Sequence, residues 1–159
     1  MKDLEPEIIQ EVLKIYKPNW RFLKSAGLDT PNYLGIFELN KQCPYLLTSL
    51  EGFDHATEIE LDNCLSQLCY TSIADMMSRN EIQGLEDYDF SKLQENGVLT
   101  IDSSKRFRKI IPRREFSGQI KLEEIRTYED LSILRYTGNF SDKSMILNSL
   151  DIVLKQPRL

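Results

Sequence analysis

Apolar residues near the start of the chain recur at the spacing of an α-helix. The stretch EPEIIQEVLKIYKP, residues 5–18, has a proline in its first turn, and Pro18 follows the last apolar position. Proline is tolerated in the first turn of a helix and ends a helix elsewhere. The pattern predicts an amphipathic helix within residues 1–18, whose apolar face carries Ile8, Ile9, Val12, Leu13 and Tyr16.

Shorter apolar runs predict strands. YLGIFELN (33–40) and CPYLLTSL (43–50) follow a polar, turn-rich patch at residues 27–32 and predict a hairpin. Beyond residue 97 the chain becomes a series of β-rich runs separated by PRR, YED and SDK, which are turn sequences at hairpin spacing. This part predicts an antiparallel meander of four strands within residues 98–155, over the runs 98–111, 115–127, 131–140 and 144–155.

The longest predicted helix is the central one, residues 62–79, and it has no charged residue from Asn63 to Ala74. A surface helix normally carries charges on its outer face, so this helix is expected to be enclosed on most sides. The polar side chains on one side of this helix must then meet hydrogen-bonding groups, water or a ligand, because an unpaired buried polar group costs about 1–3 kcal/mol. Two interpretations stay open: a core helix satisfied by neighbouring strands or a dimer mate, and a helix lining a substrate pocket.

Composition limits the class of protein. The 159 residues and 41% hydrophobic content fit a single globular domain over residues 1–159. A net charge of −5 argues against nucleic acid as a partner. Three cysteines and one histidine, with no CxxC pair, predict neither a disulfide framework nor a metal site. No apolar run approaches the roughly 18 residues of a membrane span, so we expect a soluble, cytoplasmic protein.

Two separated motifs resemble the FcoT-like hot-dog family of long-chain fatty acyl-CoA thioesterases. The first is the central motif, with the family's order and spacing, and the second is the basic stretch SSKRFRKIIPRREFSGQI, residues 103–120. The N-terminal part is also similar, through Tyr16, Phe22, Gly35, Phe37 and Tyr45. The central motif consists of His55, Thr57, Glu60, Leu61, Cys64, Ser66, Gln67 and Tyr70.

The resemblance implies a fold and a reaction. The fold is α+β, a hot-dog fold in which a long central helix is wrapped by a curved antiparallel sheet, with an extra N-terminal helix. The substrate is a fatty acyl thioester whose carbonyl lies near the start of the central helix. Free backbone N–H groups there make an oxyanion site, which we expect at Asn63 and Cys64. This chain departs from the family at Thr57 and Ser66, where the family has Asn, and so loses the amide donors.

The candidate catalytic side chains follow from the same motif. His55 can act as general base or hydrogen-bond the acyl carbonyl, or it can be a strand-end histidine satisfied by backbone. Glu60 is the alternative base, or a buried structural carboxylate. Ser66 and Gln67 can orient water or the thioester, or be satisfied core polar residues. Further hydrogen-bonding candidates are Thr57, Tyr45 and Tyr16.

A run of basic residues stands out in this acidic chain. It suits the phosphates of coenzyme A or phosphopantetheine, or the acidic surface of an acyl carrier protein. The competing interpretation is a solvated edge strand protected by charge. The candidate carrier-binding residues are Arg106, Arg108, Lys109 and Arg113.

Hydrolysis of a fatty acyl thioester by a homodimer, or a dimer of dimers, is the first functional hypothesis. The alternatives are a lyase-type reaction on an unsaturated acyl-carrier thioester, such as glycine conjugate addition, and non-catalytic acyl-thioester binding. A dehydratase or isomerase is also possible, although hot-dog dehydratases usually have a Pro-Gly turn after the histidine, and Ala56-Thr57 lacks it. No cofactor is expected beyond the coenzyme A or phosphopantetheine of the substrate.

Overall fold

The computed structural model describes residues 1–39, 55–86, 88–112 and 114–155. The N-terminal part contains β1 (Lys2–Asp3), α1 (Pro6–Leu13), the 3-10 helix η1 (Pro18–Trp20), β2 (Leu23–Asp29) and β3 (Asn32–Glu38). The central part contains α2 (Glu58–Ser78) and α3 (Phe90–Asn96). The C-terminal part contains β4 (Val98–Phe107), β5 (Glu115–Thr127), β6 (Leu131–Phe140) and β7 (Met145–Lys155).

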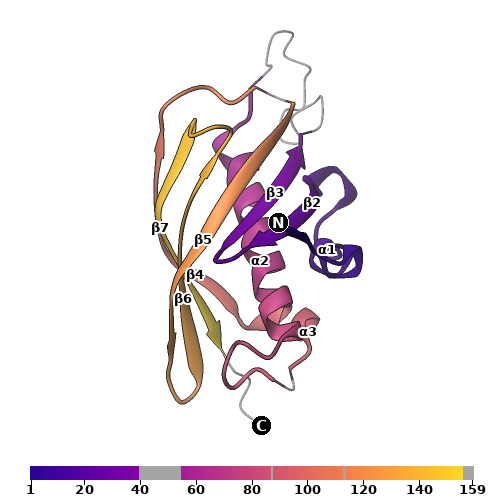
Figure 1. Cartoon of the computed structure of the whole chain (residues 1–159), viewed down its shortest axis with the longest axis vertical. Helices are drawn as coiled ribbons and strands as arrows, with labels where there is room; N and C mark the ends of the chain where they lie inside the picture. Colours follow the sequence, from indigo (N-terminus) through magenta and orange to yellow (C-terminus); the bar gives the residue numbers. More distant parts are fainter. Residues whose placement is uncertain (40–54, 87, 113, 156–159) are drawn as a thin grey trace.

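The strands form one seven-stranded sheet in the order β1-β2-β3-β5-β6-β7-β4, with every neighbouring pair antiparallel. Figure 1 shows this sheet curling around α2, with α1 packed beside β2. The long central helix, the curved antiparallel sheet and the extra N-terminal helix are confirmed. None of the helices in the described parts of the chain is long and apolar enough to cross a membrane.

The expected order of the C-terminal strands is wrong in one respect. β5, β6 and β7 pair in sequence, but β4 pairs with β7 instead of β5 and forms an edge of the sheet. Turn residues after β4 indicate that the chain reverses, but they do not determine which neighbour each strand takes. The expected partner of β3 lies in residues 43–50, outside the described residues, while β2 and β5 occupy the two edges of β3.

The central helix begins earlier than expected, at Glu58 and not at residue 62. Thr57 and Glu60 form a capping box, in which each side chain binds the backbone N–H of the other residue. Distances are 3.0 Å from the Thr57 N–H to Oε2 of Glu60 and 3.2 Å from the Glu60 N–H to Oγ1 of Thr57. The first turn is therefore fixed by the same residues that the motif analysis assigned to chemistry.

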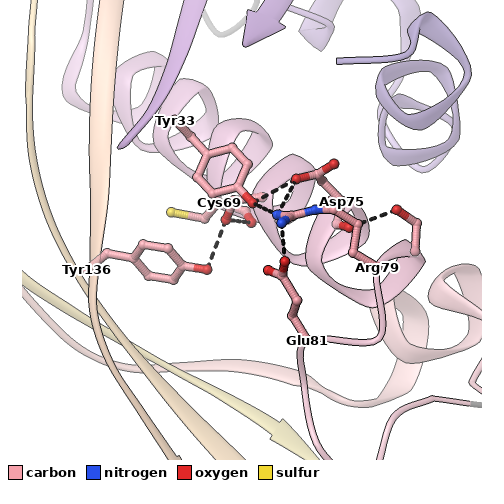
Figure 2. Close-up of polar contacts among 8 residues, drawn as sticks. Tyr33, Cys69, Asp75, Arg79, Glu81 and Tyr136 are labelled. Atoms are coloured by element: carbon pink, nitrogen blue, oxygen red, sulfur yellow. Dashed lines mark hydrogen bonds and ion pairs between the residues drawn. The ribbon is translucent and has the colours of Figure 1, made fainter. Parts of the chain in front are cut away.

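The other end of α2 is tied to β3 by a partly buried polar cluster, shown in Figure 2. The hydroxyl of Tyr33 donates to Oδ2 of Asp75 at 2.8 Å and accepts from Nη2 of Arg79 at 2.8 Å. Arg79 also pairs with Asp75 at 2.7 Å and with Glu81. Burial and the hydrogen bond to Asp75 raise the pKa of Tyr33, so this phenol stays neutral. Directional bonds thus hold the helix at both of its ends.

Candidate active site

A cavity of about 440 Å³ opens at the N-terminus of α2, and we call it the His55 cavity. It is bounded on one side by the segment leading into α2 and by the first turn of that helix, and on the other by the end of β4 and the residues after it. Two of the predicted cationic residues, Arg108 and Lys109, thus share a cavity with the only histidine. The lining residues are His55, Ala56, Glu58, Leu61, Phe107, Arg108, Lys109, Ile110 and Ile111.

His55 is held at this place by a backbone connection between the two walls. It forms an isolated antiparallel bridge with Pro112, and the N–H of Ala56 donates to the carbonyl of Ile111 at 2.8 Å. Ile111 is buried, whereas His55 is half-buried at the cavity edge. The segment after β4 therefore positions the histidine. Pro112 has no backbone N–H, but the bridge is made through the carbonyl of Ile111, so the proline is compatible with it.

The backbone N–H groups left free at the start of α2 are not those expected from the sequence, and of their two residues only Glu58 lines the His55 cavity. Because α2 begins at Glu58, the N–H groups of Asn63 and Cys64 lie in its second turn, where a helix bonds them to the carbonyls four residues earlier. The amide side chain of Asn63 also caps a local carbonyl, donating to Ile59 at 2.9 Å. The N–H groups without an intrahelical partner are those of Glu58 and Ile59. These two move the candidate oxyanion site one turn toward His55.

Glu60 and Thr57 are close to the cavity, but their side chains bind each other. The hydroxyl of Thr57 donates to Oε2 of Glu60 at 2.9 Å, in addition to the two bonds of the capping box. Glu60 is fully buried. Its contacts favour the structural alternative for this carboxylate, which is to hold the start of the helix on which the site is built.

Gln67 is also fully buried, with 0% of the residue exposed, and its amide binds backbone. Oε1 accepts from the N–H groups of Phe22 at 3.0 Å and Leu23 at 2.9 Å, and Nε2 donates to the carbonyl of Trp20 at 2.6 Å. These bonds fasten the segment between η1 and β2 to the middle of α2. Three of the four hydrogen bonds that an amide can make are used in this way, which favours the satisfied-core interpretation of Gln67.

A second cavity, of about 280 Å³, lies between the first half of α2 and the inner face of β4 and β7, and we call it the Lys105 cavity. Of the predicted catalytic side chains, Ser66 lies here, half-buried, beside the half-buried Tyr70. Ser66 is therefore separate from the His55 cavity. The lining residues are Asp62, Leu65, Ser66, Tyr70, Thr100, Ser103, Lys105, Leu150 and Ile152.

Lys105 links the two cavities. Its ammonium pairs with Asp62, which lines the second cavity, and lies 3.4 Å from Oε1 of Glu58, which lines the first. Only 15% of the Lys105 side chain is exposed. Alternation along a strand brings Thr100 and Ser103 to the same side as Lys105, across a bulge near residue 101. We did not anticipate this inward cation from the sequence, although alternation from Phe107 could have indicated it.

The other expected cationic positions are distributed around the His55 cavity. Arg106 is exposed, lies opposite Ile146 on β7 and does not line either cavity. Arg108 is exposed at the cavity wall, and its N–H donates to the carbonyl of Ser144 at 2.7 Å. Arg113 and Tyr45 lie outside the described residues. Of the expected cationic residues that the structure describes, Arg108 and Lys109 therefore border the His55 cavity and Arg106 does not.

Cys64 and Cys69 of α2 belong to the hydrophobic core, and Tyr16 packs against it. Cys64 and Cys69 are buried, and burial raises the pKa of both thiols. The pKa of Tyr16 is raised by burial and by the neighbouring Tyr70. These groups are uncharged near neutral pH and therefore supply neither a thiolate nor a phenolate. Among the described residues, no group of three or more His, Cys, Asp or Glu side chains could hold a metal ion.

A curved antiparallel sheet wrapped around one long helix is the hot-dog fold, and two solved structures share this fold. The structure superposes on the dehydratase domain of RzxB from Pseudomonas fluorescens with a TM-score of 0.59 and 18% sequence identity. The superposed part covers 95% of this chain and 49% of that chain. This chain thus spans about half the length of that domain. Zebra fish thioesterase superfamily member 2 has a TM-score of 0.52 at 8% identity, covering 94% and 92% of the two chains.

The family within this fold is defined by sequence. Residues 11–145 match the FcoT-like thioesterase domain, and the chain belongs to that family. A (2E)-enoyl-ACP glycyltransferase from Streptomyces coeruleorubidus is 25% identical over 125 residues, which cover 74% of this chain and 73% of that protein. The resemblance drawn from the central motif and the basic stretch is therefore confirmed.

Proposed function

We propose that the chain acts on fatty acyl thioesters of coenzyme A or of an acyl carrier protein, and that hydrolysis is its reaction. The observation that carries this proposal is the His55 cavity, which combines an imidazole, a helix N-terminus and two cations. An acyl thioester needs each of these: a base, an oxyanion site and a partner for the phosphate of its carrier. Family membership supports the same substrate class.

In the proposed mechanism the thioester carbonyl lies against the first turn of α2. The N–H groups of Glu58 and Ile59 and the positive end of the helix dipole stabilise the oxyanion that forms when water attacks. His55 takes a proton from that water, and the thiolate of the carrier leaves as the carbonyl re-forms and is protonated. The charges on Arg108 and Lys109 bind the carrier's phosphate at the cavity opening.

We also propose that two copies of the chain associate across the exposed side of α2. Asn63, Ser66 and Tyr70 are half-buried on this side, and Ile59 is 51% exposed. The adjoining edge strand β4 exposes Leu99 and Ile101. Neutral and apolar surface beside an unpaired strand edge is the kind of surface that a partner covers. Light scattering on the purified protein will give a dimer or a dimer of dimers if this proposal is right.

The reaction is tested by incubating the protein with saturated and 2-enoyl thioesters on coenzyme A and on an acyl carrier protein. The expected product is the free acid, identified by mass spectrometry. His55→Gln should lower turnover about 100-fold or more, because a general base contributes at least that factor. Thermal unfolding of the variant must match that of the wild type. If the protein binds a thioester but forms no product of any kind, it is a binding protein and the enzymatic proposal is refuted.

The carrier's binding site has its own test. Replacing Arg108 and Lys109 by Gln should raise KM for a carrier-bound substrate and flatten its dependence on salt, because screened charge attraction is removed. The matched control removes two exposed charges from β5 by Lys121→Gln and Arg126→Gln, and should leave KM unchanged. An unaltered KM at low salt in the Arg108/Lys109 variant argues for the alternative, a charged edge strand without a docking role.

Conjugate addition of an amine to an unsaturated acyl thioester is the second candidate. Two observations favour it: the name of the relative from Streptomyces coeruleorubidus, and the Lys105 cavity adjoining the His55 cavity. In this reaction the amine nitrogen bonds to the β-carbon of the 2-enoyl group, the resulting enolate is stabilised at the helix N-terminus, and a proton moves from nitrogen to the α-carbon. Nothing leaves, so the product retains the thioester and differs in mass from the free acid.

A further inference from the structure

We propose that the chain docks on a lipid bilayer with anionic headgroups through the residues at the end of β4. We call these residues the β4 tip, and they are Arg106, Phe107, Arg108, Lys109 and Ile110. The inference goes beyond the proposed function and does not depend on which reaction the chain catalyses. It rests on the composition of the tip, its exposure, its fixed backbone and its place beside the His55 cavity.

The sequence around the tip has only cationic and apolar side chains. Residues 105–114, KRFRKIIPRR, comprise six cationic residues, two isoleucines, one phenylalanine and one proline, with no acidic, hydroxyl or amide side chain. The chain as a whole has a net charge of −5, so this segment is opposite in sign to the molecule. Cations beside large apolar side chains are typical of segments that bind anionic membranes, because the headgroups attract the charge and the hydrocarbon boundary takes up the apolar groups.

The side chains of the β4 tip are exposed. Ile110 is 75% exposed and Phe107 is 43% exposed. The three cations are exposed as well, and none of them forms an ion pair with another residue that the structure describes. Leu99 and Ile101, which we assigned to the contact between two copies, lie at the opposite end of β4. Two large apolar side chains among exposed cations indicate a surface for a partner.

The backbone holds the tip in this exposed position. The N–H groups of Arg108 and Lys109 both donate to the carbonyl of Ser144, at 2.7 and 3.3 Å. The residue after the tip, Ile111, is buried and accepts a hydrogen bond from the N–H of Ala56 at 2.8 Å. The exposed side chains therefore project from a backbone that is fixed on both sides. Such a surface loses little conformational entropy on docking.

The tip lies beside the proposed active site. Four of its residues line the His55 cavity. Figure 1 shows the connection from β4 to β5 at the end of the molecule opposite α3. Because anionic lipids attract the tip and repel the negative charge elsewhere on the chain, the molecule docks with this end first. The opening of the cavity then faces the bilayer, and a fatty acyl product can enter the lipid without crossing water.

The acidic surface of a carrier protein would also attract these cations, but the tip suits a bilayer better. Interfaces between proteins are depleted of charged residues at their core, whereas Phe107 and Ile110 are interleaved with cations. A solvated acidic surface leaves an exposed Ile110 in water, and the hydrocarbon boundary of a bilayer removes it from water. Both partners are therefore offered to the chain in the experiment.

The experiment is flotation of the full chain with vesicles of phosphatidylcholine, alone or mixed with an equal part of phosphatidylglycerol. The chain should bind the anionic vesicles at least about tenfold more tightly than the neutral ones, and salt should weaken this binding. Arg106→Gln together with Arg108→Gln should weaken it at least about tenfold, since each cation near an anionic surface contributes roughly fivefold. Ile110→Ser should weaken it about tenfold, because the contact with hydrocarbon is lost.

Two control variants match these substitutions. Tyr128→Ser removes a 52% exposed side chain from the turn between β5 and β6, at the opposite end of β6 from the turn that contacts the tip. Lys121→Gln with Arg126→Gln lowers the net charge by as much as the double arginine variant does. Both controls should bind the anionic vesicles as the wild type does. Circular dichroism should show that all the variants are folded.

Failure of the wild type to bind anionic vesicles overturns the inference. So does vesicle binding that is equal in Ile110→Ser and the wild type, because the contact is then charge attraction alone. If an acyl carrier protein binds in a way that depends on Ile110 and the vesicles do not bind, the tip belongs to a protein partner and the inference is wrong. Turnover of thioesters without vesicle binding overturns the inference alone, whereas vesicle binding without any turnover refutes the proposed function and leaves the lipid surface standing.

Discussion

At the scale of single residues, the central motif divides into two sets. Glu60 and Gln67 are fully buried and bind backbone, whereas His55 and Ser66 are half-buried and line cavities. A buried polar side chain must be hydrogen-bonded, and these two side chains bind backbone groups that fix the position of α2 and its neighbouring segments. The motif therefore combines residues that form the site with residues that hold its supporting elements in place.

This division predicts opposite effects for two neighbouring substitutions. Gln67→Leu leaves the N–H groups of Phe22 and Leu23 and the carbonyl of Trp20 without their partner, and should lower the free energy of unfolding by at least about 2 kcal/mol. Ser66→Ala should change it by less than about 0.5 kcal/mol and, because Ser66 lies outside the His55 cavity, should lower the rate of hydrolysis less than His55→Gln does. Urea unfolding and steady-state kinetics on both variants measure this, with Gln10→Ala, on the exposed side of α1, as the control. A stable Gln67→Leu protein with little activity would instead indicate a catalytic amide.

At the scale of elements, α2 determines the geometry of the site because both of its ends are fixed. The capping box fixes the first turn, and the cluster of Tyr33, Asp75 and Arg79 fixes the last. A long helix anchored only by apolar packing could slide along the sheet, since such packing is not directional. Directional bonds at the two ends fix the height of the first-turn N–H groups relative to β4.

Tyr33→Phe tests this anchor. The substitution removes the hydroxyl that bridges Asp75 and Arg79, each at 2.8 Å, and should cost about 1–3 kcal/mol of unfolding free energy, because hydrogen bonds to charged groups are the stronger kind. Amide hydrogen exchange should rise most in the last turns of α2. Tyr128→Phe, at a 52% exposed tyrosine, should leave both measurements unchanged. Equal exchange in Tyr33→Phe and the wild type would show that apolar packing alone holds the helix.

The elements also show how far the sequence can be interpreted. Periodicity and the neutral stretch predicted the central helix and its enclosure, because both follow from local pattern. The T-x-x-E signature at Thr57 and Glu60 is local too, and would have given the correct start of the helix. The partners of Gln67 could not be predicted, because Trp20 is 47 positions away in sequence. The pairing of β4 with β7 is equally non-local. The contact between Lys105 and Asp62 depends on it and could not be predicted either.

At the scale of the whole molecule, ion pairs form between side chains on the outer face of the sheet. Arg135 on β6 binds Asp151 on β7 through two bonds of 2.7 Å, and Glu124 on β5 binds Arg126 in the same bidentate manner. The hydrogen bond from Arg135 lowers the pKa of Asp151. The Arg135–Asp151 pair thus links β6 to β7, and the pair within β5 lies beside it, because Glu124 is opposite Arg135 in the strand register. The link between β6 and β7 is sensitive to acid.

The sign of that sensitivity follows from linkage. A carboxyl group with a lower pKa in the folded chain than in the unfolded chain stabilises the fold above its unfolded pKa, about 3.9 for Asp, and loses this contribution as the pH falls through the folded value. Asp151→Asn should therefore lower Tm at pH 7, and the difference from the wild type should shrink as the pH falls below about 4. Calorimetry from pH 7 to pH 3 measures it, with the exposed Asp29→Asn as control. A difference that persists at pH 3 would show that the charge of Asp151 contributes nothing.

The place of β4 at the edge of the sheet has a consequence for how the chain acquires its active form. β4 precedes β5, β6 and β7 in the sequence, yet its hydrogen-bonding partner is β7, the strand that completes the sheet. Pairing strands that are distant in sequence costs conformational entropy and is slow. A nascent chain can therefore pair β5, β6 and β7 while β4 is still unpaired. Until β7 has been synthesised and has docked, Lys105 has no fixed place opposite Asp62. We therefore expect both cavities to be complete only once β4 has paired with β7, so the candidate site depends on this pairing.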